Sequence, residues 1–78
     1  MEEQRDEVLA TAFLRAIQAL ESMRTTLRRG ARTAAGLREA GIARHLDELA
    51  RDVEHSLQGL RSLAAVSRYH SASRRNGR

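Results

Sequence analysis

Apolar residues recur at intervals of four and three along two long stretches of this chain, and this spacing constrains the fold more than any other feature. In the first stretch the apolar positions are Leu9, Phe13, Ala16, Leu20, Met23 and Leu27. In the second stretch they are Ile42, Leu46, Leu49, Val53, Leu57, Leu60 and Ala64. Such intervals place side chains along one side of an α-helix, so the spacing predicts two amphipathic helices of the coiled-coil type.

The residues around these stretches set the expected helix boundaries. Basic residues precede a glycine at positions 28–30, a common end of a helix, so we expect the first helix over about residues 3–29. Residues 30–41 contain three glycines and are expected to form a loose bend, in which a short helical turn near 33–40 is an alternative. Because the chain has no proline, the second helix is expected to continue to Ser67 or His70.

These boundaries predict an all-α fold, an antiparallel two-helix hairpin formed by residues 1–70 and followed by a flexible basic tail at residues 71–78. The chain has only 78 residues and no cysteine. Chains below about 70–80 residues rarely draw more than about 3–5 kcal/mol from one core without disulfides, a metal or oligomerisation. The first helix also carries Val8, Ala12, Ile17 and Ala19 beside its seam. We therefore expect apolar surface to remain uncovered, as is typical of interfaces.

The charges have a structural explanation. The net charge of +4 comes from 14 basic and 10 acidic residues, and every basic residue is an arginine. Each expected helix is acidic at its start and basic at its end, which suits the helix macrodipole. In an antiparallel hairpin the same order places acidic ends beside basic ends.

Several functional classes find little support. The acidic start of the chain, residues 1–7, does not resemble a secretory signal. No stretch approaches the roughly 20 apolar residues that span a bilayer. Together with the absence of cysteine, these features predict a cytoplasmic protein without a membrane span.

Catalysis, metals and cofactors are not expected. The serines lie on the helices or in the tail, without a cysteine or a glycine-rich loop that would support nucleophilic catalysis. His55 shares a helix face with Asp52 and Glu48, but the body of the first helix offers only Glu21 and no histidine as further ligands. We expect no catalytic residues, no metal site and no cofactor.

Nucleic-acid binding is an alternative from a different class. Arginines cluster around the bend and at the C-terminus, where they could neutralise phosphates. They are Arg24, Arg28, Arg29, Arg32, Arg38, Arg68, Arg74, Arg75 and Arg78. However, the chain offers no third helix for a helix-turn-helix and only two aromatic residues for base stacking. A nucleic-acid partner is therefore not the favoured prediction.

The end of the second helix, Ser67-Arg68-Tyr69-His70-Ser71-Ala72, resembles a known family. With the short hairpin and its glycine-containing bend, this Arg-Tyr-His end is similar to the small cytoplasmic E-component chaperones of the bacterial type III secretion needle. The resemblance implies a co-chaperone that pairs with a larger helical-repeat chaperone. That pair would keep an amphipathic helix of a needle or translocator subunit from polymerising. The chain lacks the proline that such proteins often have near the bend.

The predicted function is therefore recognition of a protein partner, either as this co-chaperone or as a homodimeric helical interaction module of unknown role. The residues predicted to carry packing and partner binding are Leu9, Phe13, Ile17, Leu20, Leu46, Val53, Leu57 and Leu60. Spacing alone leaves open which of them face the other helix and which face the partner.

Overall fold

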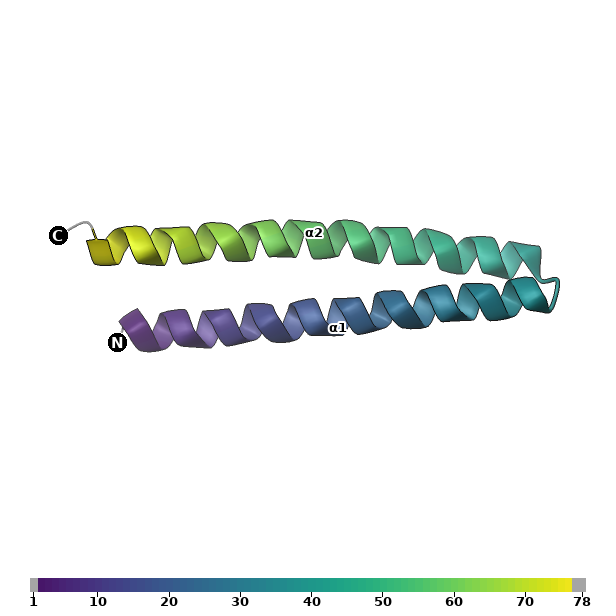
Figure 1. Ribbon diagram of the computed structural model, residues 1–78, viewed down its shortest axis with the longest axis horizontal. Helices are drawn as coiled ribbons and strands as arrows, with labels where there is room; N and C mark the ends of the chain where they lie inside the picture. The colour runs from purple at the N-terminus through teal and green to yellow at the C-terminus, as the bar shows by residue number, and fades with distance from the viewer. Residues whose placement is uncertain (1, 77–78) are drawn as a thin grey trace.

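The computed structural model describes the backbone of residues 2–76 and the side chains of residues 4–67. Its two helices, α1 (Glu2–Gly36) and α2 (Ala40–Asn76), run antiparallel as one hairpin (Figure 1). This arrangement confirms the all-α hairpin. The hairpin is a rod with extents of 62, 16 and 11 Å and a radius of gyration of 17.7 Å. A compact chain of this length would have a radius of gyration of about 11.5 Å, so the rod is far from globular.

The prediction that α1 ends before Gly30 is wrong. Gly30 lies inside α1, which continues to Gly36, and the predicted turn near 33–40 is mainly the last part of this helix. A Cβ atom built on Gly30 would lie only 3.3 Å from Cδ1 of Leu46. The glycine therefore permits a close approach of α2 and does not end the helix.

A tight connection at residues 37–39 replaces the predicted loose bend. The Glu39 amide donates to the Ala34 carbonyl at 2.8 Å, and the Arg38 amide donates to the Ala35 carbonyl at 3.0 Å. These two bonds form a Schellman helix end, which requires one residue in the left-handed region. That residue is Arg38, with φ of 62°, and not the glycine that usually occupies the position.

Both helices extend beyond their predicted ends. At its C-terminal end α2 continues through Asn76, into the segment that was expected to be a tail. At the bend, the last turn of α1 has no basic residue and the first turn of α2 has no acidic residue. The macrodipole explanation of the charges is therefore wrong for these two helix ends.

The core between the helices is narrow and consists mostly of alanine. The buried residues among the described side chains are Ala31, Ala34, Ala50, Leu57 and Ala64. Leu57 is completely buried and is the only large side chain among them. Because alanine has a small side chain, these positions allow the helices to lie close together.

The rows of residues that face the other helix, which we call the central rows, include most of the predicted seam, and most of the remaining predicted positions differ from them by one residue. The central rows contain Phe13, Ile17, Leu20, Arg24, Leu27, Ala31 and Ala34 of α1 and Ala43, Leu46, Ala50, Val53, Leu57, Leu60 and Ala64 of α2. Met23, Ile42 and Leu49 were predicted in the seams, but they are 50%, 54% and 37% exposed. The residues that follow them, Arg24, Ala43 and Ala50, are each less exposed and occupy the central rows. The prediction favoured the larger apolar side chain of each neighbouring pair, whereas close packing selected the smaller one in α2 and an ion-paired arginine in α1.

Candidate protein-interaction surface

One long side of the hairpin carries two parallel rows of apolar and small uncharged residues, which we call the open apolar face. In each row the residues are seven positions apart, about two helical turns, so they lie along the same side of their helix. The row on α1, which continues into the bend, contains Leu9, Ala16, Met23, Gly30 and Leu37. The row on α2 contains Ile42, Leu49, Ser56 and Leu63.

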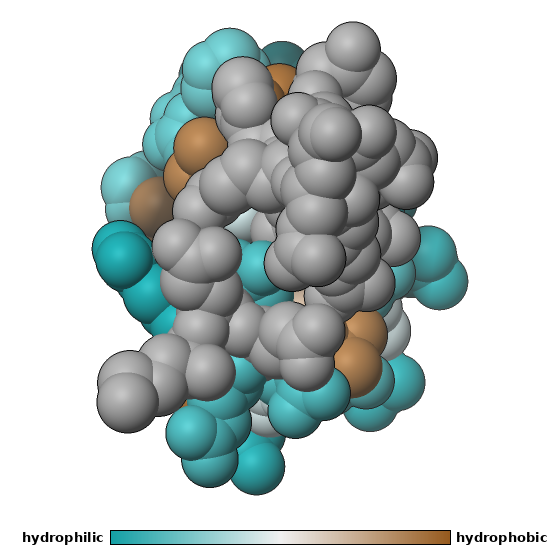
Figure 2. Space-filling view, turned by 90° about the vertical axis from the view of Figure 1, so that its left-hand side faces the viewer, coloured by the Kyte–Doolittle hydropathy of each residue, from teal (hydrophilic) through white to brown (hydrophobic). Residues whose placement is uncertain are grey.

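The larger side chains of this face are open to solvent. Leu9, Met23, Leu37, Ile42, Leu49 and Leu63 are between 37% and 71% exposed. Figure 2 looks along the rod from the end that carries both termini, and it shows hydrophobic residues at the surface beside the hydrophilic ones. The prediction that the hairpin leaves apolar surface uncovered is therefore confirmed. A contiguous exposed apolar surface on a soluble domain typically marks a binding site.

The opposite side of the seam carries charges that connect the helices, and we call it the ion-pair flank. Arg24 of α1 donates a hydrogen bond to Glu54 of α2, and Arg61 of α2 donates to Glu21 of α1 at 3.0 Å. Glu21, Glu54 and Arg61 each directly follow a residue of the central rows, whereas the residues of the open apolar face directly precede one. Both helices are right-handed and they run in opposite directions. The rows that directly follow the central rows therefore lie on one side of the helix pair, and the rows that directly precede them lie on the other.

The Arg24–Glu54 pair is more enclosed than the Arg61–Glu21 pair, whose side chains are 46% and 40% exposed. Its side chains are only 23% and 29% exposed. The hydrogen bond from Arg24, reinforced by Arg28 and Arg61, lowers the pKa of Glu54 below its ordinary value of 4.5. The same hydrogen bond raises the pKa of Arg24. A charged residue in the centre of a helical seam fixes the register, because other registers would leave it without its partner.

This pair predicts a pH dependence of stability. Because folding lowers the pKa of Glu54 below its ordinary value of 4.5, the pair stabilises the hairpin above that value, and this contribution is lost as the pH falls through the lower pKa of the folded state. Glu54→Gln should therefore lower stability at pH 7, and the difference from the unmodified protein should shrink as the pH falls below 4.5. Urea unfolding followed by circular dichroism across this range measures the difference.

The matched control is Glu48→Gln, which removes an exposed carboxylate from the outer side of the same helix. This control should leave stability at pH 7 nearly unchanged. A difference between Glu54→Gln and the unmodified protein that stayed constant down to pH 3 would contradict the assignment.

The predicted recognition residues lie mostly between the helices. Leu57 is buried, whereas Leu9 is 40% exposed and belongs to the open apolar face. The remaining six are partly covered positions of the seam: Phe13, Ile17, Leu20, Leu46, Val53 and Leu60.

Of the exposed large residues of the open apolar face, only Leu9 is among the predicted recognition residues. The missing residues are Met23, Leu37, Ile42, Leu49 and Leu63. The sequence feature that could have identified these residues is their spacing of seven positions. This spacing shows a third apolar row beside the two rows that form the seam.

The side chains of the Arg68-Tyr69-His70 end, on which the family resemblance rests, lie outside the described residues. In the part of the chain with described side chains, no group of three or more histidine and acidic residues could hold a metal ion, and the face with His55 forms none. Neither helix, over its described residues, has a stretch long and apolar enough to cross a membrane.

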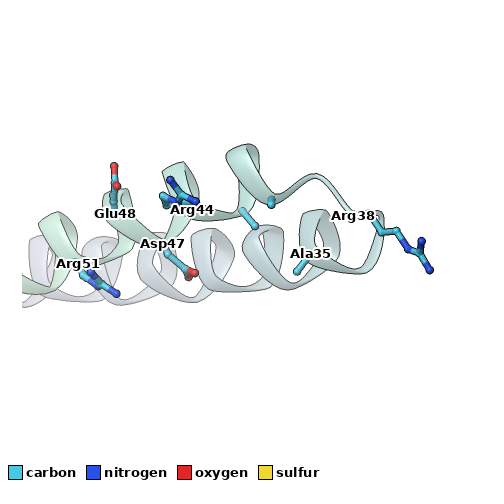
Figure 3. A pocket seen from close by; sticks show the side chains of 8 residues that line it. Ala35, Arg38, Arg44, Asp47, Glu48 and Arg51 are labelled. Atoms are coloured by element: carbon cyan, nitrogen blue, oxygen red, sulfur yellow. The ribbon is translucent and has the colours of Figure 1, made fainter.

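Two shallow hollows lie away from the open apolar face. The first, at the bend, is lined by charged residues that include Arg38, Arg44, Asp47, Glu48 and Arg51. Their side chains diverge, and Arg38 points away from the end of the rod (Figure 3). This hollow therefore brings no charged groups together around a ligand.

The second hollow lies along α1 and is basic. It is lined by Arg24, Thr25, Arg28, Arg29 and Arg32. Arg24 is engaged by Glu54. The other three arginines are exposed, and their side chains are accessible to the phosphates of a nucleic acid.

Comparison of the chain with protein-family models, with curated proteins and with solved structures finds no match. The similarity to secretion chaperones therefore rests on the sequence resemblance alone, and the structure establishes a small two-helix hairpin with an exposed apolar side.

Proposed function

We propose that this protein is a helical interaction module that binds another polypeptide through its open apolar face. The single observation that carries the proposal is the set of exposed large apolar side chains in two parallel rows on one side of the hairpin. Two neighbouring helices with apolar and small residues along a common side offer a surface that suits an amphipathic helix.

The surface area of the chain supports this proposal. The chain exposes 6444 Å², whereas a folded monomer of 8.7 kDa would expose about 4,700 Å². This excess of about 1,700 Å² on one chain is about twice the roughly 800 Å² that each partner contributes to a standard protein–protein interface. The chain therefore has enough uncovered surface for a partner of at least standard interface size.

Within this class, we propose more specifically a cytoplasmic co-chaperone of the type III secretion needle. The resemblance of the sequence supports it, and the face suits its requirement, because an amphipathic helix of a needle or translocator subunit has an apolar side that must be covered before assembly. A helical-repeat chaperone would be the second partner.

The general proposal is tested with two matched variants. Leu49→Asp places a charge in the open apolar face, and Leu14→Asp places the same charge on the ion-pair flank, where Leu14 is 55% exposed. Co-expression with a candidate partner from a neighbouring gene, followed by affinity purification, measures complex formation. We expect Leu49→Asp to abolish recovery of the partner and Leu14→Asp to leave it unchanged. Equal recovery with both variants would show that binding does not use this face.

The specific proposal has its own test. It requires genes for a needle subunit and a secretion apparatus near the gene of this protein, and their absence would refute the co-chaperone assignment. Retention on DNA or RNA at low salt, with a steep loss as salt rises, would instead favour binding through the arginines of α1.

A further inference from the structure

We propose that, in the purified protein, a second copy of this chain covers the open apolar face, so that two hairpins form a symmetric four-helix bundle with both bends at the same end. This inference rests on the proposed function, because it names the occupant of the same face. A different client polypeptide would then have to displace the second copy.

The apolar pattern of each helix is wider than one neighbouring helix requires. The central rows of each helix occupy two of every seven positions, and the open apolar face adds a third. A strict two-in-seven pattern suits a helix with one neighbour, whereas three in seven is typical of a helix that packs against two neighbours in a bundle. Each helix of the hairpin has one neighbour within the chain. The third row therefore provides for a second neighbour.

The third apolar row lies on the same side of both helices. The cross-helix contact between Glu21 and Arg61 places the residues that follow the central rows together on one flank. The residues that precede the central rows therefore share the other flank. Two helices thus present their additional apolar rows in one direction, and a pair of antiparallel helices can cover both rows at once.

The excess surface area of the chain is large enough for an interface with a second copy. If each of two copies covered the excess of about 1,700 Å² over a compact monomer, the interface would bury about 3,400 Å² in total. Obligate homodimers bury about 2,000–5,000 Å². A second hairpin of the same length therefore has the size that the uncovered surface requires, whereas a single short peptide would leave much of it exposed.

The order of large and small residues along the open apolar face favours one orientation of the two copies. Because the helices run antiparallel, the residue numbers at any one level along the rod have a nearly constant sum. The contact between Arg24 and Glu54 shows that this sum is close to 80. At three successive levels of the face, one helix then contributes a large side chain and the other a small residue. These level pairs are Leu63 with Ala16, Met23 with Ser56, and Leu49 with Gly30.

A twofold axis along the rod places α1 of one copy over α2 of the other at the same level. At the three levels named above, each large side chain then meets the small residue of its own level pair in the partner, for example Met23 over Ser56. A twofold axis across the rod at the level of Met23 would instead place Leu63 over Leu49 and Ala16 over Gly30. Close packing of side chains favours the first arrangement, because it alternates large and small residues.

The first experiment measures the oligomeric state. Light scattering coupled to size-exclusion chromatography, at tens of micromolar protein, should give a dimer for the unmodified chain and for Leu14→Asp. Leu49→Asp and Met23→Asp should each give a monomer under the same conditions. A monomeric unmodified protein, or a dimer that Leu14→Asp dissociates and Leu49→Asp does not, would overturn the inference.

The second experiment needs no destabilised variant. The chain has no cysteine, so Arg38→Cys provides one site for a spin label, at the exposed bend and outside the open apolar face. Pulsed electron paramagnetic resonance should give an inter-label distance on the order of 20 Å, about two helix diameters. Bends at opposite ends would separate the labels by nearly the 62 Å length of the rod, and such a distance would overturn the proposed orientation.

The two proposals can fail separately. If the purified protein is a monomer but Leu49→Asp still abolishes capture of a co-expressed partner, the dimer is refuted and the proposed function stands. If the protein is a stable monomer and no capture depends on Leu49, both are refuted.

Discussion

Replacing Leu57 with alanine should lower the free energy of unfolding by about 2–5 kcal/mol. Leu57 has no solvent exposure, and the other buried residues described are alanines, whose short side chains cannot fill the resulting cavity. A chain of this size draws only about 3–5 kcal/mol from a single core. We therefore expect the variant to lose most of its helical circular dichroism at 25 °C. The comparison should be made at one protein concentration, because association would add to apparent stability.

Leu14→Ala is the matched control for this experiment. It removes the same atoms from a side chain that is 55% exposed on α1, and a substitution of this kind should change stability by no more than about 0.5 kcal/mol. Equal melting curves for Leu57→Ala and the unmodified chain would contradict the position of Leu57 at the centre of the seam.

Replacing Ala50 with leucine should also destabilise the hairpin, by about 1–3 kcal/mol or more. Ala50 is 2% exposed and lies in the central row of α2. A leucine at this position must push α1 away or adopt a strained side-chain conformation. Thermal unfolding followed at 222 nm measures the effect, which should appear as a lower midpoint.

Ala65→Leu provides the control, since Ala65 is exposed on the same helix and leucine is nearly as good a helix former as alanine. This pair also distinguishes the two possible seams. If the row that contains Leu49 were central, as the spacing first indicated, Ala50→Leu would be tolerated as well as Ala65→Leu. Equal stability of the two variants would therefore show that the helices are rotated relative to the structure described here.

The glycines show why helix boundaries were harder to predict than the helices themselves. Gly30 follows two arginines, as a helix-ending glycine often does, yet it lies inside α1 and leaves room for Leu46 of α2. The residue that does adopt the left-handed conformation is Arg38. Local sequence cannot distinguish a glycine needed for its backbone freedom from one needed for its small size, because the second requirement comes from another helix.

The open apolar face shows a similar limit on predicting a site. The sequence indicates that surplus apolar residues exist, because three rows per helix exceed what one neighbouring helix can cover. It does not indicate which row remains uncovered. That choice depends on how each helix is rotated about its axis, and the rotation is set by packing and by the Arg24–Glu54 pair.

The sequence by itself determined two amphipathic helices, their antiparallel pairing and a surplus of apolar surface, because these follow from the spacing of side chains on a short chain without proline. Only the tertiary structure decided that alanines fill the centre and that larger residues such as Met23 and Leu49 remain exposed along one flank. The physical reason is that rows of residues seven positions apart lie side by side around each helix. A small rotation of the helix about its own axis therefore turns a different row toward the other helix. Only the fit between the two helix surfaces selects among such rotations.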